Sequence, residues 1–494
     1  MRRIAALSLL LLASIAPAQE RPNIIFILAD DLGYGDLGCY GQSKIRTPNL
    51  DRMAAEGTRL TQHYSGNAVC APSRCVLMTG LHPGHAYIRN NKEHRPEGQE
   101  PLPEEIVSLP KLLKASGYTT GGFGKWGLGG PGTSGQPLKQ GFDRWFGYYC
   151  QAVAHSFYPA SLWNDDQPFP LNTPPISGHD TFKPAEDPND PAAYKRFQGT
   201  QYSADLIAEE ARQFIHTNRE RSFFCYIPTT VPHLALQVPD DSLNEYAGHW
   251  EDPPYKGGHG YIPHFAPRAA YAAMITRMDR EIGRLLDLVQ ELGIDERTIF
   301  VFSSDNGPLH GEHQGLGGTD AEFFQSSGGL RNGKGTLYEG GFRVPGIVRW
   351  KGKVPAGAVQ HRVTGFEDWL PTLLELAGLT DRIPGEIDGI SFAKTLLGEF
   401  QPQRPFLYRE FPGYGGQQAI REGNWKLIRT QLMPTKKALA QGRQPNLELF
   451  DLAADPAEQH NLAETHPEVI SRLLDRMRQE HRNSAIFPFP ALDQ

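Results

Sequence analysis

The chain has 494 residues and a formal net charge of −7, with 39% hydrophobic and 21% charged residues. These values are typical of a large folded enzyme. The modest net charge and the absence of a basic block argue against a nucleic acid or a membrane surface as a partner. Gly (52) and Pro (40) are abundant while aromatic residues remain at 10%, which predicts many ordered loops rather than a disordered tract.

The N-terminus has the three-part pattern of an export signal. Arg2 and Arg3 form a positively charged region, residues 4–15 are mostly apolar, and Ala16-Pro17-Ala18 is a small-residue cleavage site. We predict a signal peptide over residues 1–18 and an exported protein, either periplasmic or secreted. No segment reaches the ~20 apolar residues that cross a bilayer, so no membrane span is expected.

The following segments alternate between strands and helices. Residues 23–29 are an apolar run of strand length, typical of a central parallel strand covered on both faces. Further helices are predicted at 48–57, 73–80, 109–117, 202–218 and 269–293, and further strands at 118–123, 222–228 and 297–304. This order predicts an α/β fold with a doubly wound sheet, in which ligands bind beyond the carboxyl ends of the strands. Residues 159–191 and 238–267 look like loop insertions.

The pattern changes near residue 400. Short strands are predicted at 404–410, 418–421, 425–430 and 447–451, followed by a helix at 467–479. We therefore predict a catalytic domain over residues 19–400 and a C-terminal subdomain over residues 401–494, built from an antiparallel sheet and one helix.

Acidic and amide side chains follow two of the predicted strands. Asp30 and Asp31 come directly after the first strand, and Asp305 and Asn306 follow the strand that ends at Ser304. If these strands are neighbours, three carboxylates converge, which is costly unless a cation neutralises them. Oxygen ligands alone favour Ca²⁺ first and Mg²⁺ second. Each pair alone has the simpler interpretation of a helix or turn cap, whereas the two pairs together favour the metal.

The five cysteines are an odd number for an exported protein. They are Cys39, Cys70, Cys75, Cys150 and Cys225. At least one is therefore unpaired and a candidate for a reactive or modified thiol, while the pairing of the others cannot be deduced. Cys75 is predicted to be a buried residue of a helix. Taken alone, Cys70 is also explained as a packing residue or a disulfide partner.

Cys70-Ala71-Pro72-Ser73-Arg74 resembles the Cys-x-Pro-Ser-Arg signature of the type I sulfatases. Other motifs of that family follow in the family's order: Thr79-Gly80, Gly124-Lys125-Trp126, Pro232-His233, Asp305-Asn306-Gly307, Gly333-Lys334-Gly335 and Tyr338-Glu339-Gly340-Gly341. The resemblance extends from about residue 21 to the C-terminal strands. It implies an alkaline phosphatase-like fold, with a large, mostly parallel mixed sheet between helices and a smaller C-terminal antiparallel sheet with a helix.

The resemblance also implies roles for individual residues. A maturation enzyme would oxidise Cys70 to formylglycine, and Arg74 would stabilise the hydrated aldehyde. The implied Ca²⁺ ligands are an oxygen of modified Cys70 together with Asp30, Asp31, Asp305 and Asn306. Lys125, His233 and Lys334 would surround the sulfate, where a metal and lysines stabilise the charge that builds on its oxygens. His233 or Lys334 would protonate the leaving oxygen.

The sequence departs from the family pattern at one position. Many members read Gly-Lys-x-His, with the histidine assisting collapse of the covalent intermediate, and Gly127 stands at that position here. His155 and His85 are candidates to replace the missing histidine, and we favour His155.

The segment 317–324 lies between the Asp305 and Lys334 motifs, so we expect it at the rim of the pocket. Asp320 and Glu322 are candidates to accept hydrogen bonds from sugar hydroxyls. Trp163, His179 or His310 could frame a sugar ring, although an ordinary polar loop explains the segment equally well.

The sequence thus predicts an exported sulfatase acting on a sulfated carbohydrate, first a galactose or N-acetylgalactosamine sulfate, or on an aryl sulfate. One alternative is a phosphodiesterase or phosphonate monoester hydrolase that shares the formylglycine motif. The other is a non-catalytic carbohydrate-binding protein, which the missing histidine favours slightly. The oligomeric state is left open.

Overall fold

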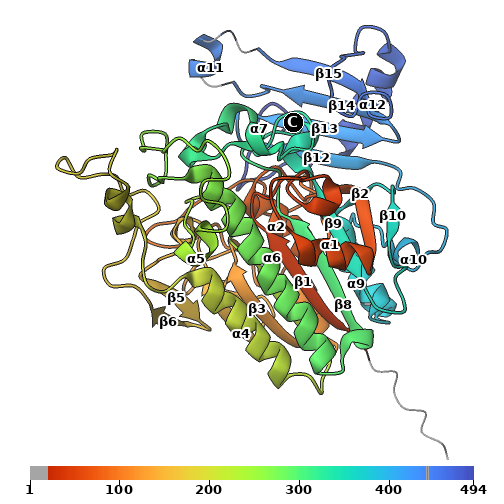
Figure 1. The fold of residues 1–494 in the computed structure, drawn as a ribbon. Helices are drawn as coiled ribbons and strands as arrows, with labels where there is room; N and C mark the ends of the chain where they lie inside the picture. Colours follow the sequence, from red (N-terminus) through yellow and green to blue (C-terminus); the bar gives the residue numbers. More distant parts are fainter. Residues whose placement is uncertain (1–20, 435, 441, 443, 494) are drawn as a thin grey trace, which may run out of the picture.

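The computed structural model describes residues 21–434, 436–440, 442 and 444–493. The predicted signal peptide lies outside the described residues. Figure 1 shows a large sheet flanked by helices and a second, smaller sheet beyond one end of it. The large sheet has eleven strands and the small one has four, so the predicted combination of a mixed sheet and a C-terminal antiparallel sheet is confirmed.

The large sheet is built around β1 (Asn23–Ala29), which pairs in parallel with both β7 (Phe223–Pro228) and β8 (Thr298–Ser304). β3 (Thr119–Lys125) and β4 (Arg144–Tyr148) continue the parallel part, while β9 (Arg343–Arg349) and β2 (Thr58–Tyr64) extend the other side in antiparallel pairs. The remaining strands are β5 (Ser161–Asn164), β6 (Gln167–Pro170), β10 (Ala358–Gln360) and β11 (Thr364–Gly365).

Helices cover both faces of this sheet. One face carries α1 (Pro48–Ala55), α4 (Ser203–Thr217) and α6 (Pro267–Glu291), and the other carries α2 (Cys70–Thr79), α3 (Leu109–Ala115) and α9 (Trp369–Leu376). Short helices are α5 (Asp240–Leu243), α7 (Ala321–Phe324), α8 (Glu339–Phe342), α10 (Ala393–Leu396) and α11 (Lys436–Ala440).

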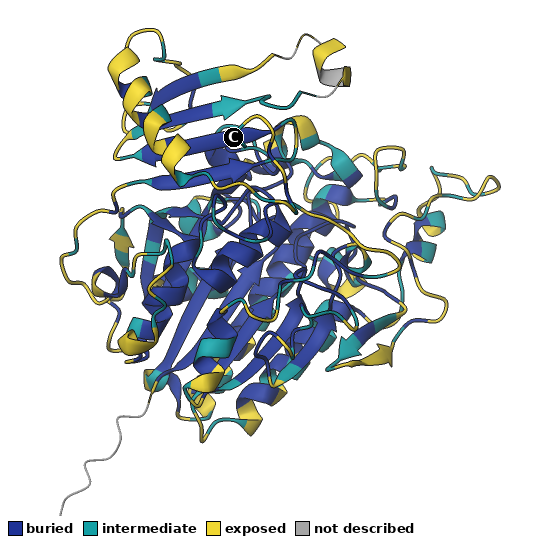
Figure 2. Ribbon diagram, turned by 180° about the vertical axis from the view of Figure 1, so that it is seen from behind, coloured by how far each residue is buried: buried dark blue, intermediate teal, exposed yellow. Residues whose placement is uncertain are grey.

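The apolar sequence of β1 follows from its position between two cores. Ile25 and Ile27 pack into the core under α4 and α6, whereas Ile24 and Phe26 pack into the core under α2 and α9. Because successive side chains of a strand point to opposite faces, a strand covered on both sides has to be apolar throughout. Figure 2 shows the central strands buried along their length, with exposure concentrated in the outer loops and helix surfaces.

The C-terminal sheet contains β12 (Leu407–Phe411), β13 (Gln417–Glu422), β14 (Trp425–Thr430) and β15 (Asn446–Asp451), all antiparallel. Helix α12 (Pro467–Glu480) packs on one face through Val469 and Leu473. The other face packs on Ala68, Val69 and Leu337 of the larger unit. The domain boundary at residue 400 itself stays a prediction.

Some local expectations need correction. The helix predicted at 73–80 begins at Cys70, and the insertions at 159–191 and 238–267 contain β5, β6 and α5. Strands β2, β4 and β9 were not predicted, because β2 carries several polar side chains and Pro345 interrupts β9. Cys75 is buried in α2 as predicted, and all five cysteines are unpaired. Among the described residues, no helix is long and apolar enough to cross a membrane.

Candidate active site

The site forms where β1, β8 and β3 end and α2 begins. Cys70 is the first residue of α2 and only 1% exposed. Arg74 lies one helical turn further on, so that both side chains project from the same face of the helix. The N-terminus of a helix carries a partial positive charge, which favours a negative group at Cys70.

Three carboxylates meet beneath Cys70, because β1 and β8 are parallel and in register at their ends. Ala29 pairs with Ser304, and the Asp305 backbone N–H donates to the Ala29 carbonyl at 3.0 Å. The Asp31 N–H donates to Asp305 Oδ1 at 3.3 Å. Asp31 has φ 65°, a left-handed conformation that is rare and costly for a residue other than glycine, and such strain is concentrated at functional sites.

Two lysines approach the same point. Lys125 Nζ lies 2.6 Å from Asp30 Oδ2 and 3.6 Å from Cys70 Sγ. Lys334 Nζ lies 2.6 Å from Asp31 Oδ1 and 3.7 Å from Cys70 Sγ. The structure thus brings the thiol, both lysines and the acidic pair together from distant parts of the chain.

Arg74 completes the set of buried cations. Its Nη2 lies 2.9 Å from Asp305 Oδ2 and 3.2 Å from Asp30 Oδ2, and its Nη1 donates to the Lys125 carbonyl. Arg74, Asp30 and Asp305 are all 0% exposed, so their interactions are screened little by water.

The cluster changes the proton affinity of its members. Burial opposes the ionisation of Asp30, but the charges of Lys125 and Arg74 outweigh it and lower the pKa of Asp30. Burial and the Asp30 charge raise the pKa of Asp305 to about 6. Burial, with the charges of Asp30 and Asp305, raises the pKa of the Cys70 thiol, so an unmodified Cys70 is a poor nucleophile at neutral pH.

The donor atoms fit a hard cation. Asn306 Nδ2 donates to Asp31 Oδ1 at 2.7 Å, whereas the buried Asn306 Oδ1 has no hydrogen-bond partner in the described part of the chain. Ligand atoms of Asp30, Asp31, Cys70 and His233 all lie within 4.8 Å of one another. An unpartnered amide oxygen beside three carboxylates is the donor set that Ca²⁺ prefers.

His233 lies at the edge of this cluster. Its Nδ1–H donates to the Leu234 carbonyl at 2.5 Å, which leaves Nε2 facing Asp31 Oδ2 at 3.7 Å. Burial and the charges of Lys125 and Lys334 lower the pKa of His233 well below its usual value. His233 is therefore neutral and presents a lone pair at Nε2.

The two histidines proposed to replace the missing one lie in different places. His155, at the end of a 3₁₀ helix (Val153–His155), stacks on His233 with ring centroids 5.0 Å apart and an interplanar angle of 14°. His85 instead bonds Asp388 at 2.8 Å and stacks on His82. Of the two candidates, His155 is the one beside the cluster.

Asp388, with His82 and His85, forms a second group of possible metal ligands. His82 Nδ1 accepts a hydrogen bond from Gly84 N–H at 3.2 Å, so its proton is on Nε2, which points at Glu480 Oε2 3.2 Å away. In the structure this group forms a hydrogen-bonded contact between α12 and the larger unit.

A residue that the sequence did not single out fills the space beside Gly127. Gly127 has φ +83°, and a Cβ there would lie 2.8 Å from Gln151 Nε2. Gln151 is 4% exposed, and its Nε2 has no partner among the residues that the structure describes. Because no family motif of the sequence includes Gln151, only the fold reveals this contact.

Most of the residues expected to hold a sugar make other contacts. Asp320 pairs with Arg268 at 2.7 Å and accepts from the Phe323 N–H, so it caps α7. Trp163 donates to Glu97 at 2.8 Å. The other candidates are Glu322, which is exposed on α7, His310, whose buried Nδ1 is unpartnered within the described residues, and His179, which bonds His155.

A groove opens beside Lys334, between the large unit and the C-terminal sheet. It contains about 710 Å³ of empty space and is lined by His313 and Tyr414, whose rings lie 5.5 Å apart, and by residues such as Gln417 and Gln431. Tyr414 is 52% exposed, which is unusual for a large aromatic side chain and leaves its ring free to contact a ligand.

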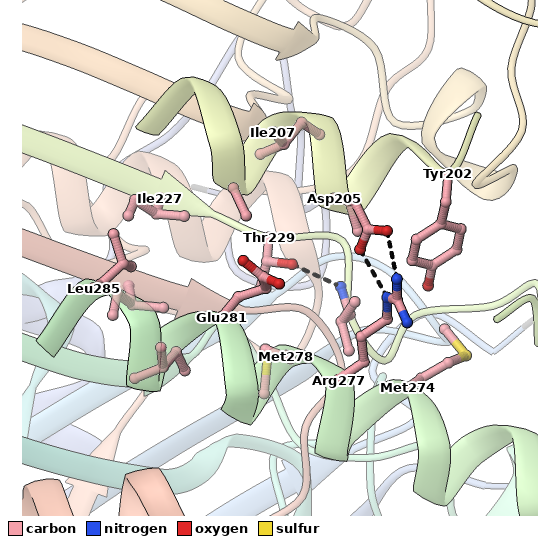
Figure 3. A pocket seen from close by; sticks show the side chains of 15 residues that line it. Tyr202, Asp205, Ile207, Ile227, Thr229, Met274, Arg277, Met278, Glu281 and Leu285 are labelled. Carbon is pink, nitrogen blue, oxygen red and sulfur yellow. Dashed lines mark hydrogen bonds and ion pairs between the residues drawn. The ribbon is translucent and has the colours of Figure 1, made fainter. Parts of the chain in front are cut away.

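A second, narrow pocket lies between α4 and α6 and is drawn in Figure 3. Its lining is mainly apolar, with the Arg277–Asp205 ion pair on one side and Ile227 on another. None of the cluster around Cys70 lines it, so this cavity is separate from the chemistry.

The comparisons with known proteins identify the family. The model of the family described as Sulfatase matches residues 22–379, which is more than half of the chain. The chain belongs to the sulfatase family. A second family model, N-sulphoglucosamine sulphohydrolase C-terminal, matches residues 332–483 of this sulfatase.

Curated relatives agree with this assignment. Human arylsulfatase A is 33% identical over 95% of the sulfatase chain and 89% of its own length. N-acetylgalactosamine-6-sulfatase of Canis lupus familiaris is 33% identical over 80% of the chain and 69% of its own length. The protein is therefore a sulfuric ester hydrolase.

Solved structures agree on the fold. A protein from work on the metabolism of multiple glycosaminoglycans by Bacteroides thetaiotaomicron is 28% identical, covers 93% of this chain and 99% of its own, and has a TM-score of 0.70. The phosphonate monoester hydrolase of Agrobacterium radiobacter has a TM-score of 0.62 at 19% identity, with 94% and 96% covered, and so is similar in fold alone. The predicted alkaline phosphatase-like fold is confirmed.

Proposed function

We propose that this sulfatase is an exported, formylglycine-dependent enzyme that holds Ca²⁺ and removes sulfate from a sulfated carbohydrate. One observation carries the proposal: Cys70 Sγ lies within 3.7 Å of both Lys125 Nζ and Lys334 Nζ at the N-terminus of α2, beside three carboxylates. This arrangement suits an anionic substrate held against a group at position 70.

The modification of Cys70 accounts for its surroundings. The raised pKa keeps the thiol protonated, so a cysteine here lacks the thiolate that attacks electrophiles. Once formed by a maturation enzyme, formylglycine supplies, as a hydrated aldehyde, an oxygen nucleophile for the sulfur atom. Arg74, fixed by Asp30 and Asp305, keeps a positive charge beside that position.

The proposed metal ligands are oxygen atoms of Asp30, Asp31, Asp305, Asn306 and modified Cys70. Ca²⁺ in this set supplies positive charge next to the sulfate oxygens, and Mg²⁺ is the alternative. The unpartnered Asn306 Oδ1 is the structural support for this assignment.

Lys125 and Lys334 bind the sulfate oxygens in this proposal. Their charges oppose the negative charge that builds on the sulfate, and the low exposure of the site strengthens that effect. His233, with Nδ1 committed to the Leu234 carbonyl, moves a proton at Nε2. His155 replaces the histidine that many family members have at the position of Gly127, and it acts as a proton acceptor next to His233.

A carbohydrate fits the groove beside Lys334. An aromatic face next to polar side chains is the usual composition of a site for a ring with apolar and hydroxyl faces. The N-acetylgalactosamine-6-sulfatase relative supports a galactose or N-acetylgalactosamine sulfate as the substrate. Export is supported by the sequence pattern of residues 1–18.

The alternatives carry less support. The phosphonate monoester hydrolase is similar in fold alone, and the relatives above 30% identity described here are sulfatases. A non-catalytic binding protein would not need the strained Asp31 and three buried cations around Cys70.

The test combines two measurements on the enzyme after native export. Mass spectrometry of the peptide that contains Cys70 is expected to show the aldehyde, and a panel of defined sulfated sugars is expected to reveal turnover of a galactose or N-acetylgalactosamine sulfate. A retained thiol would overturn the formylglycine proposal. Turnover of a phosphonate in preference to every sulfate ester would overturn the substrate proposal.

A further inference from the structure

Hydrolysis of a sulfate ester releases a proton, and in this protein the groups around the reaction are buried. One alkyl sulfate monoanion and one water give an alcohol, a sulfate dianion and one proton, because an S–O bond to the alcohol breaks and an S–O bond from water forms. The groups around Cys70 are almost completely buried: Lys125 is 1% exposed and Asp30 and Arg74 are 0% exposed. Each turnover therefore needs a route by which a proton reaches bulk water.

A pair of histidines leads from the cluster toward the surface. His155 stacks on His233, and its Nδ1 lies 3.0 Å from His179 Nε2, within hydrogen-bond distance. His155 is half-buried, whereas His179 is exposed. With Nδ1 used by His179, Nε2 is the ring nitrogen left for the cluster, and no other residue in the described part of the chain is hydrogen-bonded to the His155 ring.

The two loop insertions hold this pair in position. The Gly178 backbone packs directly on the His155 carbonyl, where a Cβ would come within 1.8 Å of the oxygen, so only glycine fits. The Ile262 N–H donates to the Gly178 carbonyl at 3.0 Å, which ties the second insertion to the first. Tyr261 closes the arrangement, with its ring 4.8 Å from His179 and 5.4 Å from His155.

We propose that His155 and His179 form the outlet that carries the proton of hydrolysis from the buried site to solvent. His155 accepts a proton at Nε2 and gives the proton on Nδ1 to His179 Nε2, and His179 passes one proton to water. In this proposal His179 also sets the tautomer of His155. The hydrogen bond from His155 Nδ1 to His179 Nε2 holds the His155 proton on Nδ1 and leaves His155 Nε2 free.

The charges around His155 favour outward transfer. Burial and the charges of Lys125 and Lys334 lower the pKa of His155 to about 2. A proton that arrives at His155 is therefore not retained, and the exposed ring of His179 is the next acceptor. The hydroxyl of Tyr261, whose pKa is raised by burial, stays protonated beside the pair.

The outlet is tested with His179→Ala and His179→Gln, using His216→Ala as the matched control, since His216 is an exposed histidine in the last turn of α4. Turnover of an aryl sulfate is measured in weak buffer and again with added imidazole. In weak buffer both His179 variants are expected to lose about ten- to a hundredfold in kcat, at or below the usual contribution of a positioned proton-transfer group. Imidazole is expected to restore the kcat of His179→Ala, and the kcat of His216→Ala is expected to match that of the wild type.

A second readout does not depend on turnover. In ¹⁵N-histidine-labelled enzyme, the nitrogen shifts of His155 are expected to report a proton on Nδ1 in the wild type and a mixture of tautomers in His179→Ala. Wild-type kcat of His179→Ala in weak buffer would overturn the proposal. So would a loss of kcat that imidazole does not restore, since a purely structural defect has that signature. Because the proposal depends only on sulfatase turnover, an aryl sulfate tests it even if the proposed sugar is wrong.

Discussion

Arg74 donates two hydrogen bonds to a single oxygen of Asp305, from Nε at 3.0 Å and from Nη2 at 2.9 Å. Both side chains are completely buried. The guanidinium thereby connects the first turn of α2 to the end of β8, and it fixes the position of Cys70 relative to the carboxylates.

Arg74→Met is expected to lower the free energy of unfolding by about 3–5 kcal/mol, because it leaves buried carboxylates without their partner. Urea denaturation followed by circular dichroism measures the loss. Arg472→Met is the control, since the Arg472–Glu422 pair is 52% and 39% exposed and is expected to contribute about 1 kcal/mol or less. Equal losses of unfolding free energy for the two variants would contradict the stabilising role of buried Arg74.

Removal of Ca²⁺ is expected to lower the melting temperature of the wild type. An ion at a hundredfold excess over its Kd stabilises the folded state by about 2.7 kcal/mol, and chelation removes that contribution. Asn306→Ala removes the unpartnered Oδ1, so its melting temperature is expected to rise less on adding Ca²⁺. Calorimetry with and without Ca²⁺ checks this, and an equal rise in both proteins would exclude Asn306 as a ligand.

Gly127→Ala is expected to destabilise the protein by more than about 1 kcal/mol, because of its left-handed φ and the contact with Gln151. The matched control is Gly352→Ala, since Gly352 has φ +73° and nothing within 4 Å of its would-be Cβ. Adding Gln151→Ala is expected to recover part of the stability lost in Gly127→Ala and none of the stability lost in Gly352→Ala. A double-mutant cycle without coupling would show that Gln151 does not restrict this position.

Tyr414→Ala is expected to raise KM for a sulfated sugar about tenfold, as expected for the loss of a stacking contact of roughly 1.4 kcal/mol. The kcat/KM for a small aryl sulfate is expected to change little, because such a substrate does not fill the groove. Tyr414→Phe keeps the ring and serves as the control. Equal losses on both substrates would mean that Tyr414 does not contact the sugar.

The contact of His481 with Glu410 is expected to make stability depend on pH. Although burial disfavours the charged ring, the hydrogen bond and charge of Glu410 raise the pKa of His481 above 6.5. A raised folded-state pKa contributes stability that is complete below about pH 6.5 and is lost as pH rises through the folded-state value. The difference in unfolding free energy between the wild type and His481→Gln is therefore expected to shrink between pH 6 and 8, roughly one unit either side of neutrality. A constant difference would contradict it.

Much of the active site could be predicted from the sequence because it is carried by strand ends. One apolar strand is followed by Asp30-Asp31 and another by Asp305-Asn306. These residues form one metal site only if the two strands are neighbours, and the pairing of Ala29 with Ser304 shows that they are. The grouping of Cys70 with Lys125 and Lys334 was implied by the resemblance to the sulfatases. Asp320, a candidate sugar ligand, caps α7 and pairs with Arg268, as the alternative of an ordinary polar loop expects.

The sequence alone determined the central apolar strands and the long helices, the acidic groups at the strand ends, and the family that the chain resembles. Only the tertiary structure decided which loops meet at the site: His179 against His155, Gln151 beside Gly127, and Tyr414 of the β12–β13 turn in the lining of the groove. The burial of a strand on one or both faces follows a period of two that can be read from its pattern of apolar residues. Contacts between loops depend instead on how separate insertions pack on one another, and no local pattern of residues encodes that.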